Sequence, residues 1–274
     1  MPELHPIGIF DSGIGGLTIF DAITKKLPQY DYIYFGDNAR TPYGTRSFEV
    51  VYAYTLQAVK RLFDMGCHLV ILACNTASAK ALRNIQQKDL FGIDPERRVL
   101  GVIRPSIEVI SDITKTRHVG ILGTEGTVSS ESYPIEIKKL FPDIVTVQEA
   151  CPMWVQLVES NEIENPGTDY FVKKNIQSLL AKDPEIDTIV LGCTHYPMLN
   201  NTIRKFVPSH IKIISQGEIV AEKLEDYLRR HPEMDEKCTK NGIIKFYTSE
   251  SPVLFKKKSK LFLKREVEVE HLEL

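Results

Sequence analysis

The sequence has little of what usually identifies a protein class. Its five cysteines are odd in number and widely spaced, and they form no Cys-x-x-Cys or Cys/His pattern. This spacing argues against a disulfide scaffold and against a structural metal site. No apolar run reaches the length of about 18 residues that a transmembrane helix needs. We therefore expect no membrane-spanning segment and no metal.

An excess of charge of one sign is also lacking. Lys and Arg together number 34 and Asp and Glu 36, which gives a net charge of −2 over 274 residues. Such a balance provides no electrostatic reason for nucleic acid or an anionic membrane to be the main partner. The opening "MPELHPIGIF" leads directly into a strand pattern, without a charged-then-apolar signal. A reduced, cytoplasmic protein is the expectation.

Apolar runs typical of strands alternate with amphipathic helix patterns along the chain. Most runs are continuous rather than alternating, as expected for strands covered on both faces. Alternation of strands and helices favours parallel sheets joined by right-handed crossovers, an α/β architecture. The expected strands are 7–10, 32–35, 69–73, 99–103, 119–122, 144–147, 188–192, 211–214, 243–247 and 267–272, and the clearest helices are 48–64, 76–87, 169–182 and 218–230.

Two patterns occur twice. A strand entering a Gly-rich turn is found in "IGIFDSGIGG" (7–16) and, 112 residues later, in "VGILGTEGTV" (119–128). A strand ending in a cysteine is found in "VILACNTAS" (70–78) and, 119 residues later, in "IVLGCTHYP" (189–197). These offsets predict two similar, pseudo-symmetric α/β domains, each with a mostly parallel sheet flanked by helices. Because ligands bind at the carboxyl ends of parallel strands, we expect the active site in the cleft between them.

Cys74 and Cys193 are the candidate reactive groups. A cysteine after an apolar run is usually core, and Cys67 and Cys238 are interpreted in that way. Cys74 and Cys193 differ because polar residues follow them and each opens a strand-to-helix turn, where the helix N-terminus favours a thiolate. Two thiols on opposite walls suit removal of a proton from a carbon and its return to the other face. That reaction is a two-base racemisation or epimerisation.

Three alternatives stay open from these residues. The two cysteines would also suit a redox dithiol, which requires sulfur atoms about 2 Å apart in the oxidised form. Cys193 with His195 would suit a hydrolase nucleophile, for which Cys74 would be dispensable. The same fold would suit a non-catalytic regulator that binds a small molecule or another protein.

Five motifs in order resemble the cofactor-independent glutamate racemases of the aspartate/glutamate racemase group. They are "IGIFDSGIGGLT", "GDNARTPYG", "ACNTAS", "GTEGT" and "LGCTHYP". The resemblance implies interconversion of L- and D-glutamate without a cofactor, a supply of D-glutamate for peptidoglycan, and a homodimer. It further implies one domain at 1–101 plus 215–274 and a second at 102–214. Some members of the family are associated with gyrase inhibition, so a second role of that kind stays open, as does activity on aspartate.

The resemblance also implies roles for individual residues. Cys74 would take the α-proton from D-glutamate and Cys193 from L-glutamate, and Asp11 and His195 would assist the neighbouring thiols. Glu159 corresponds to a family glutamate near the histidine. The implied substrate-binding residues are Asp11, Ser12, Pro42, Tyr43, Gly44, Asn75, Thr76, Thr124, Thr127, Thr194 and His195.

Without the resemblance, several of these residues have simpler interpretations. Asp11 and Ser12 would be an ordinary turn or helix cap, and "TPYG" (41–44) would be a simple turn. Glu159 would be a helix-surface glutamate. The basic run "KKKSK" (256–260) is interpreted as a solvated helix face rather than a nucleic-acid site.

The chain departs from the family pattern outside the strand-end motifs. The departures are Arg104, Met153, Trp154 and Gln156. We expect these departures to affect interfaces, regulation or cleft dynamics rather than the reaction.

Overall fold

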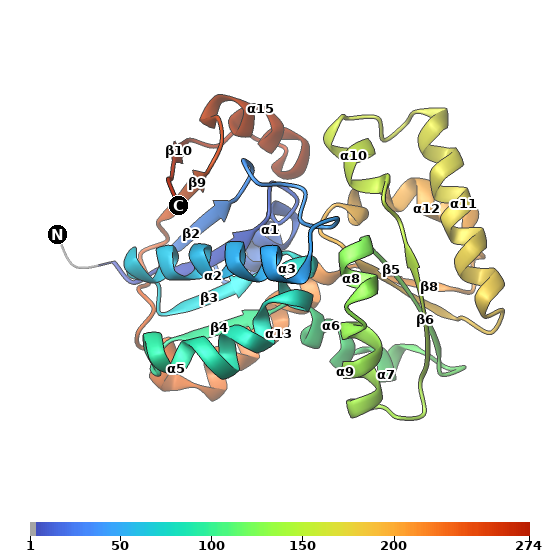
Figure 1. The fold of residues 1–274 in the computed structure, drawn as a ribbon, viewed down its shortest axis with the longest axis horizontal. Coiled ribbons are helices and arrows are strands. Elements are labelled where there is room, and N and C mark those ends of the chain that lie inside the picture. The colour runs from blue at the N-terminus through green and yellow to red at the C-terminus, as the bar shows by residue number, and fades with distance from the viewer. Residues whose placement is uncertain (1–3) are drawn as a thin grey trace.

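The computed structural model describes residues 4–274, which form two parallel β-sheets lying side by side (Figure 1). The first sheet has six strands in the order β10-β9-β2-β1-β3-β4. Its strands are β1 (Ile7–Asp11), β2 (Tyr32–Gly36), β3 (Leu69–Leu72), β4 (Arg98–Gly101), β9 (Ile244–Thr248) and β10 (Val269–His271). The last two strands return from the C-terminal end of the chain, and Figure 1 shows this red segment beside the blue N-terminal strands.

The second sheet has four strands from one continuous stretch of chain, in the order β6-β5-β7-β8. Its strands are β5 (His118–Gly123), β6 (Val145–Ala150), β7 (Thr188–Gly192) and β8 (Lys212–Ile214). All pairings in both sheets are parallel. The carboxyl ends of the strands in each sheet therefore meet at one edge, where polar residues can gather.

Helices join the strands and cover both faces of the sheets. Helix α1 packs against α13 and α15, and α11 packs against α12 and β6. The helices are α1 (Leu17–Lys26), α2 (Phe48–Asp64), α3 (Asn75–Lys80), α4 (Leu82–Asn84), the π-helix η1 (Ile85–Asp89), α5 (Leu90–Ile93), α6 (Ile103–Glu108), α7 (Ile110–Ile113), α8 (Glu125–Ser129), α9 (Ser132–Leu140), α10 (Trp154–Glu159), α11 (Pro166–Lys182), the 3₁₀-helix η2 (Tyr196–Leu199), α12 (Asn200–Phe206), α13 (Gln216–Arg230), α14 (Pro232–Asp235) and α15 (Pro252–Leu263). None of the helices in residues 4–274 combines the length and the apolar character needed to cross a bilayer.

The hydrophobic core explains why the strand sequences are continuous apolar runs. Ile9 and Leu191 belong to one cluster of buried side chains that extends across both sheets. Phe10 belongs to a second cluster on the other face of the first sheet, and Val190 to a third cluster in the second sheet. Neighbouring residues of one strand thus enter different clusters, since successive side chains point to opposite faces. The central strands are apolar on both faces for this reason.

The predicted α/β class with two mostly parallel sheets is confirmed, and all ten expected strands are present. The predicted domain limits, 1–101 plus 215–274 and 102–214, stay predictions. One helix prediction is wrong. Residues 76–87 do not form a single helix but belong to α3, α4 and the π-helix η1. The Ser78 hydroxyl donates to the Leu72 carbonyl at 2.8 Å and so holds α3 on its strand, and at Ala81 φ reaches −113°. The helix is therefore interrupted after the 6 residues of α3.

Gly36 provides a test of how the first sheet supports the loop after β1. A Cβ atom at Gly36 would lie 2.3 Å from the Gly13 carbonyl oxygen, a backbone atom that cannot rotate away. We expect Gly36→Ala to lower the free energy of unfolding by about 1–3 kcal/mol, the usual cost of overpacking. The measurement is chemical denaturation. Gly92→Ala is the matched control, because no atom of the described residues 4–274 lies within 4 Å of its added Cβ. Equal stability of the two variants would contradict the proposed close packing.

Candidate active site

A small cavity lies between the two sheets and contains both cysteines singled out from the sequence. Its volume is about 70 Å³, more than the roughly 10–15 Å³ that one water needs and less than the ~300 Å³ of open ligand pockets. The cavity is therefore small for a ligand pocket. It is lined by Ser12, Thr41, Pro42, Tyr43, Gly44, Thr45, Cys74, Asn75, Thr76, Thr124, Glu125, Cys151, Pro152, Val155, Gln156, Cys193, Thr194 and His195.

Cys74 lies between the end of β3 and the start of α3. Its sulfur caps α3 by accepting from the Ala77 N–H at 3.4 Å, and its thiol donates to the Ser12 hydroxyl at 3.3 Å. Burial, together with the nearby Asp11 carboxylate, raises the pKa of the Cys74 thiol to about 12. The structure therefore holds Cys74 as a protonated thiol, able to donate a proton.

Cys193 lies at the end of β7 and has a different neighbour. Its sulfur is 3.9 Å from Nδ1 of His195, and Nε2 of His195 is 3.0 Å from Oε1 of Glu159. Burial alone would lower the pKa of His195, but the hydrogen bonds with Cys193 and Glu159 outweigh it and raise the pKa to about 10. An imidazolium next to a sulfur stabilises the thiolate. The two sulfurs thus have different polar neighbours, the His195 ring beside Cys193 and the Ser12 hydroxyl beside Cys74.

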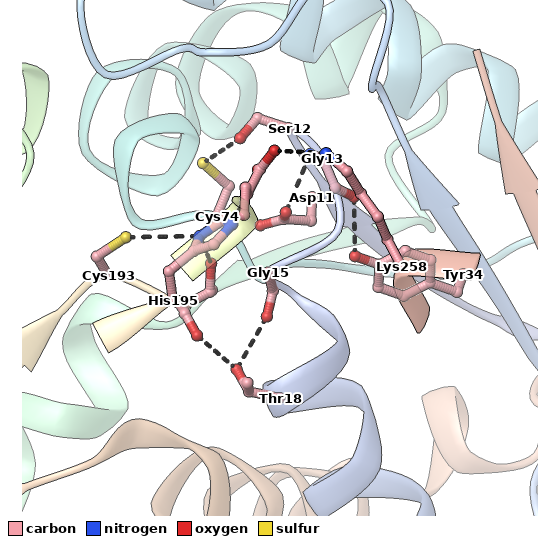
Figure 2. A network of polar contacts seen from close by, with 12 residues as sticks. Asp11, Ser12, Gly13, Gly15, Thr18, Tyr34, Cys74, Cys193, His195 and Lys258 are labelled. Carbon is pink, nitrogen blue, oxygen red and sulfur yellow. Dashed lines mark hydrogen bonds and ion pairs between the residues drawn. The ribbon is translucent and has the colours of Figure 1, made fainter. Parts of the chain in front are cut away.

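Glu159 and Lys258 extend this network to the C-terminal helix. Oε2 of Glu159 lies 3.1 Å from Nζ of Lys258 on α15. Burial alone would raise the pKa of Glu159, but His195 and Lys258 lower it to about 2. Figure 2 shows the network, with Lys258 at one side and Cys193 at the other. The basic run 256–260 is a largely exposed helix face, as expected, yet one of its lysines reaches the site.

Asp11 ends β1 and is buried, with 1% of its surface exposed. Its Oδ2 accepts from the Gly13 N–H at 3.0 Å, and its Oδ1 has no partner within residues 4–274. Burial raises the pKa of Asp11, and the nearby charge of His195 opposes this effect. A buried carboxylate oxygen without a partner is costly unless a ligand supplies a donor. Asp11 therefore lies behind the cavity wall with an acceptor oxygen that no described residue satisfies.

The Gly-rich turn after β1 packs directly on the second cysteine turn. A Cβ atom at Gly15 would lie 2.3 Å from the His195 ring, so only glycine fits. The Thr18 hydroxyl donates to the Thr194 carbonyl at 2.9 Å (Figure 2). These contacts bring Asp11 and His195, which come from different sheets, to the same side of the cavity.

Hydroxyl groups and a loop form the remaining wall. The Thr76 and Thr124 hydroxyl oxygens are 2.9 Å apart, and those of Thr124 and Thr127 are 3.1 Å apart. The Gly126 N–H donates to the Gly44 carbonyl at 2.7 Å, which joins α8 to the loop 41–44. In that loop the Tyr43 hydroxyl donates to Asp37 at 2.5 Å, so the phenol group supports the loop from behind.

The structure gathers most of the predicted site residues but not all of them. Eleven line the cavity: Ser12, Pro42, Tyr43, Gly44, Cys74, Asn75, Thr76, Thr124, Cys193, Thr194 and His195. Asp11, Thr127 and Glu159 do not line it and lie behind these residues. Their roles stay predictions. Metal ligation has no candidate group, since residues 4–274 contain no cluster of three or more His, Cys, Asp or Glu side chains that could hold an ion.

Cys151 is the cysteine of the cavity that the sequence analysis did not single out. It follows directly after β6, which ends at Ala150, whereas the predicted strand ended at 147. With the correct end of the strand, the same strand-end rule would have found it. Cys151 is fully buried, and burial raises the pKa of its thiol well above the ordinary value. It therefore forms a neutral part of the wall, with Pro152, Val155 and Gln156 beside it.

Comparisons with known proteins agree with this geometry. Residues 17–224 match the family described as Asp/Glu/Hydantoin racemase, and the chain belongs to that family. A glutamate racemase of Persephonella marina is 39% identical over 98% of this chain and 97% of its own length, and one of Dinoroseobacter shibae is 36% identical over 97% and 98%. The resemblance inferred from the five motifs is confirmed.

Solved structures are similar over the same extent. A glutamate racemase of Bacillus anthracis superimposes with a TM-score of 0.90 at 32% identity, covering 99% of this chain and 98% of that one. A glutamate racemase of Francisella tularensis in complex with D-glutamate has a TM-score of 0.87 at 30% identity, with the same coverage. The family match and the similar solved structures thus establish the fold and the racemase class.

The lowered pKa of Glu159 predicts a pH-dependent contribution to stability. Because the folded-state pKa is about 2, below the ordinary 4.5, the contribution is complete above pH 4.5 and is lost as the pH falls toward 2. We expect Glu159→Gln to lower the free energy of unfolding by up to about 3 kcal/mol near neutral pH. This difference from the unaltered protein should shrink as denaturation is repeated at lower pH.

Glu266→Gln is the control, because Glu266 is exposed and forms only a 4.0 Å pair with Lys260. It should unfold like the unaltered protein throughout. A Glu159→Gln difference that stays constant as the pH falls would show that the carboxylate charge is not the cause.

Proposed function

We propose that this protein is a glutamate racemase that interconverts L- and D-glutamate by two-base proton transfer without a cofactor. The observation that carries the proposal is the pair of buried thiols in one cavity, each at the end of a parallel strand in a different sheet. Their unequal surroundings support it, because a two-base reaction needs one group to accept a proton and the other to donate one. The glutamate racemases named above support the choice of substrate.

In the direction from L-glutamate, the Cys193 thiolate takes the α-proton. The electron pair left on the α-carbon then takes a proton from the Cys74 thiol on the opposite face, which yields D-glutamate, a Cys193 thiol and a Cys74 thiolate. The reverse direction uses the same groups in exchanged roles. His195 assists Cys193, while Asp11 assists Cys74 from behind the cavity wall. No electrons or atoms are required from any other reagent.

The remaining cavity groups hold the two carboxylates. Asn75, Thr76, Thr124 and Thr194 offer amide and hydroxyl donors, and the loop 41–44 offers backbone donors. The small volume of the cavity supports a closed state that excludes water, so glutamate enters after the two sheets separate. A racemase has more support than a hydrolase built on Cys193 and His195, because a hydrolase would leave Cys74 without a role.

The proposal includes the wider setting inferred from the resemblance. The enzyme would act in the cytoplasm as a homodimer and supply D-glutamate for peptidoglycan. The family match supports this setting because the relatives named above are glutamate racemases, the family from whose resemblance the setting was inferred.

The direct test is incubation of the purified protein with each enantiomer of glutamate and of aspartate, without pyridoxal phosphate or added metal. We expect the optical rotation of both L- and D-glutamate to decay to zero, because each thiol serves one direction. Polarimetry or circular dichroism follows the decay. No change with any of the four amino acids would sink the racemase proposal, and loss of rotation with aspartate alone would change the substrate.

Replacing one thiol at a time tests which cysteine removes the α-proton from which enantiomer. Serine is a much weaker acid than cysteine, so Cys74→Ser and Cys193→Ser should each slow racemisation by about 10²–10⁴-fold. An analogue that loses a β-substituent after deprotonation needs only the first base. Cys74→Ser should therefore still process the L analogue, and Cys193→Ser the D analogue, with the elimination product as the readout.

Cys238→Ala is the matched control, because Cys238 is a buried cysteine outside the cavity. It should racemise glutamate at the parent rate. If both serine variants preferred the same enantiomer of the analogue, the assignment of one thiol to each face would be wrong.

A further inference from the structure

Gln216 lies where the chain passes between the two sheets for the second time. It follows β8, begins α13 and is buried, with 2% of its surface exposed. The first passage follows β4, at Val102 and the start of α6. The Gln216 amide nitrogen donates to the Val102 carbonyl at 3.1 Å and to the Ser106 hydroxyl at 2.8 Å. One side chain therefore ties the two passages to each other.

The same side chain contacts Asn75, the residue after Cys74. Oε1 of Gln216 accepts from Nδ2 of Asn75 at 2.6 Å, and Oδ1 of Asn75 accepts from the Tyr133 hydroxyl at 2.8 Å. The Tyr133 oxygen also lies 3.0 Å from the Gln216 nitrogen, whose two hydrogens are therefore shared among three acceptors, the Val102, Ser106 and Tyr133 oxygens. The three side chains are buried and form a closed ring of hydrogen bonds between α3, α9 and α13. A buried ring of this kind leaves each member little freedom.

The polarity of the ring follows from one backbone group. The Val102 carbonyl can only accept, so the amide of Gln216 must turn its NH₂ toward Val102 and its oxygen toward Asn75. Asn75 must then turn its own NH₂ toward Gln216 and its oxygen toward Tyr133. The second hydrogen of this NH₂ has no protein acceptor within residues 4–274, and Asn75 lines the cavity. It is free to donate to a carboxylate.

We infer that Gln216 is a positioning residue, which fixes the Asn75 side chain as a hydrogen-bond donor to a substrate carboxylate. This inference rests on the proposed function, which supplies the carboxylate. If the Asn75 amide could rotate, it would also present its oxygen, and two oxygens carrying negative charge repel each other. Because Gln216 also holds both passages of the chain, the orientation of Asn75 depends on the arrangement of the two sheets.

The test compares steady-state kinetics of Gln216→Met with those of the unaltered protein. Methionine is similar in length but forms no comparable hydrogen bonds, so the Asn75 amide loses its acceptor. We expect KM to rise about tenfold for both L- and D-glutamate, the effect of one lost hydrogen bond to a charged group. We expect kcat to change little, because the carboxylate is bound equally in the ground and transition states. Thermal unfolding of each variant is measured in parallel.

Three further variants separate positioning from a merely structural role. Ser106→Ala removes the hydrogen bond of Gln216 on the side away from Asn75, so it should leave KM unchanged even if it lowers the unfolding temperature. Tyr133→Phe removes the other hydrogen bond to Asn75 and should raise KM like Gln216→Met. This variant therefore tests the positioning role even if Gln216→Met does not fold. In an Asn75→Ala background, Gln216→Met should have no further effect on KM.

Two results would overturn the inference and can be told apart. If the unaltered protein racemises glutamate but Gln216→Met or Tyr133→Phe keeps its KM, or if Ser106→Ala raises KM equally, Gln216 acts on stability alone. If the unaltered protein turns over no glutamate, the proposed function fails and the role of Gln216 fails with it.

Discussion

The hydrogen bonds that the His195 ring forms with Cys193 and Glu159 determine the charge of that ring. Burial by itself would lower the pKa of His195, and these two hydrogen bonds raise it instead. The carboxylate in turn stays ionised because His195 and Lys258 both contact it. Three elements meet in this arrangement, namely the end of β7, α10 and α15. The position of α15, which carries Lys258, is therefore coupled to the charge of His195 beside Cys193.

The pseudo-symmetry of the two sheets does not extend to the charges at their strand ends. Cys74 caps a short helix, contacts a serine and lies near the Asp11 carboxylate, which favours the protonated thiol. Cys193 instead has the His195 ring, whose pKa is raised, as its polar neighbour. The backbone arrangement thus repeats while the polar neighbours of the two sulfurs differ.

The sequence predicts those parts of the fold and site that depend on local patterns. The central strands are apolar on both faces, and Cys74 and Cys193 follow them directly, so both the α/β class and the strand-end thiols are visible in the residues. Cys151 was missed because β6 continues through polar residues to Ala150, where hydrophobicity no longer marks a strand. Lys258 and Gln216 were missed because each acts through a contact between distant segments, 99 and 141 residues apart. The hydrophobic periodicity of a sequence does not reveal contacts between distant segments.

The return of the C-terminal segment into the first sheet also has a consequence for the order in which the protein can fold during synthesis. The second sheet is complete once β8 has emerged, because its four strands are consecutive. The first sheet must wait for β9, which lies between β2 and β10. Until then β2 is an unpaired edge made of buried aromatic and apolar residues, the kind of edge that pairs with other chains. The N-terminal strands thus depend on residues synthesised about 200 positions later for their protection from aggregation.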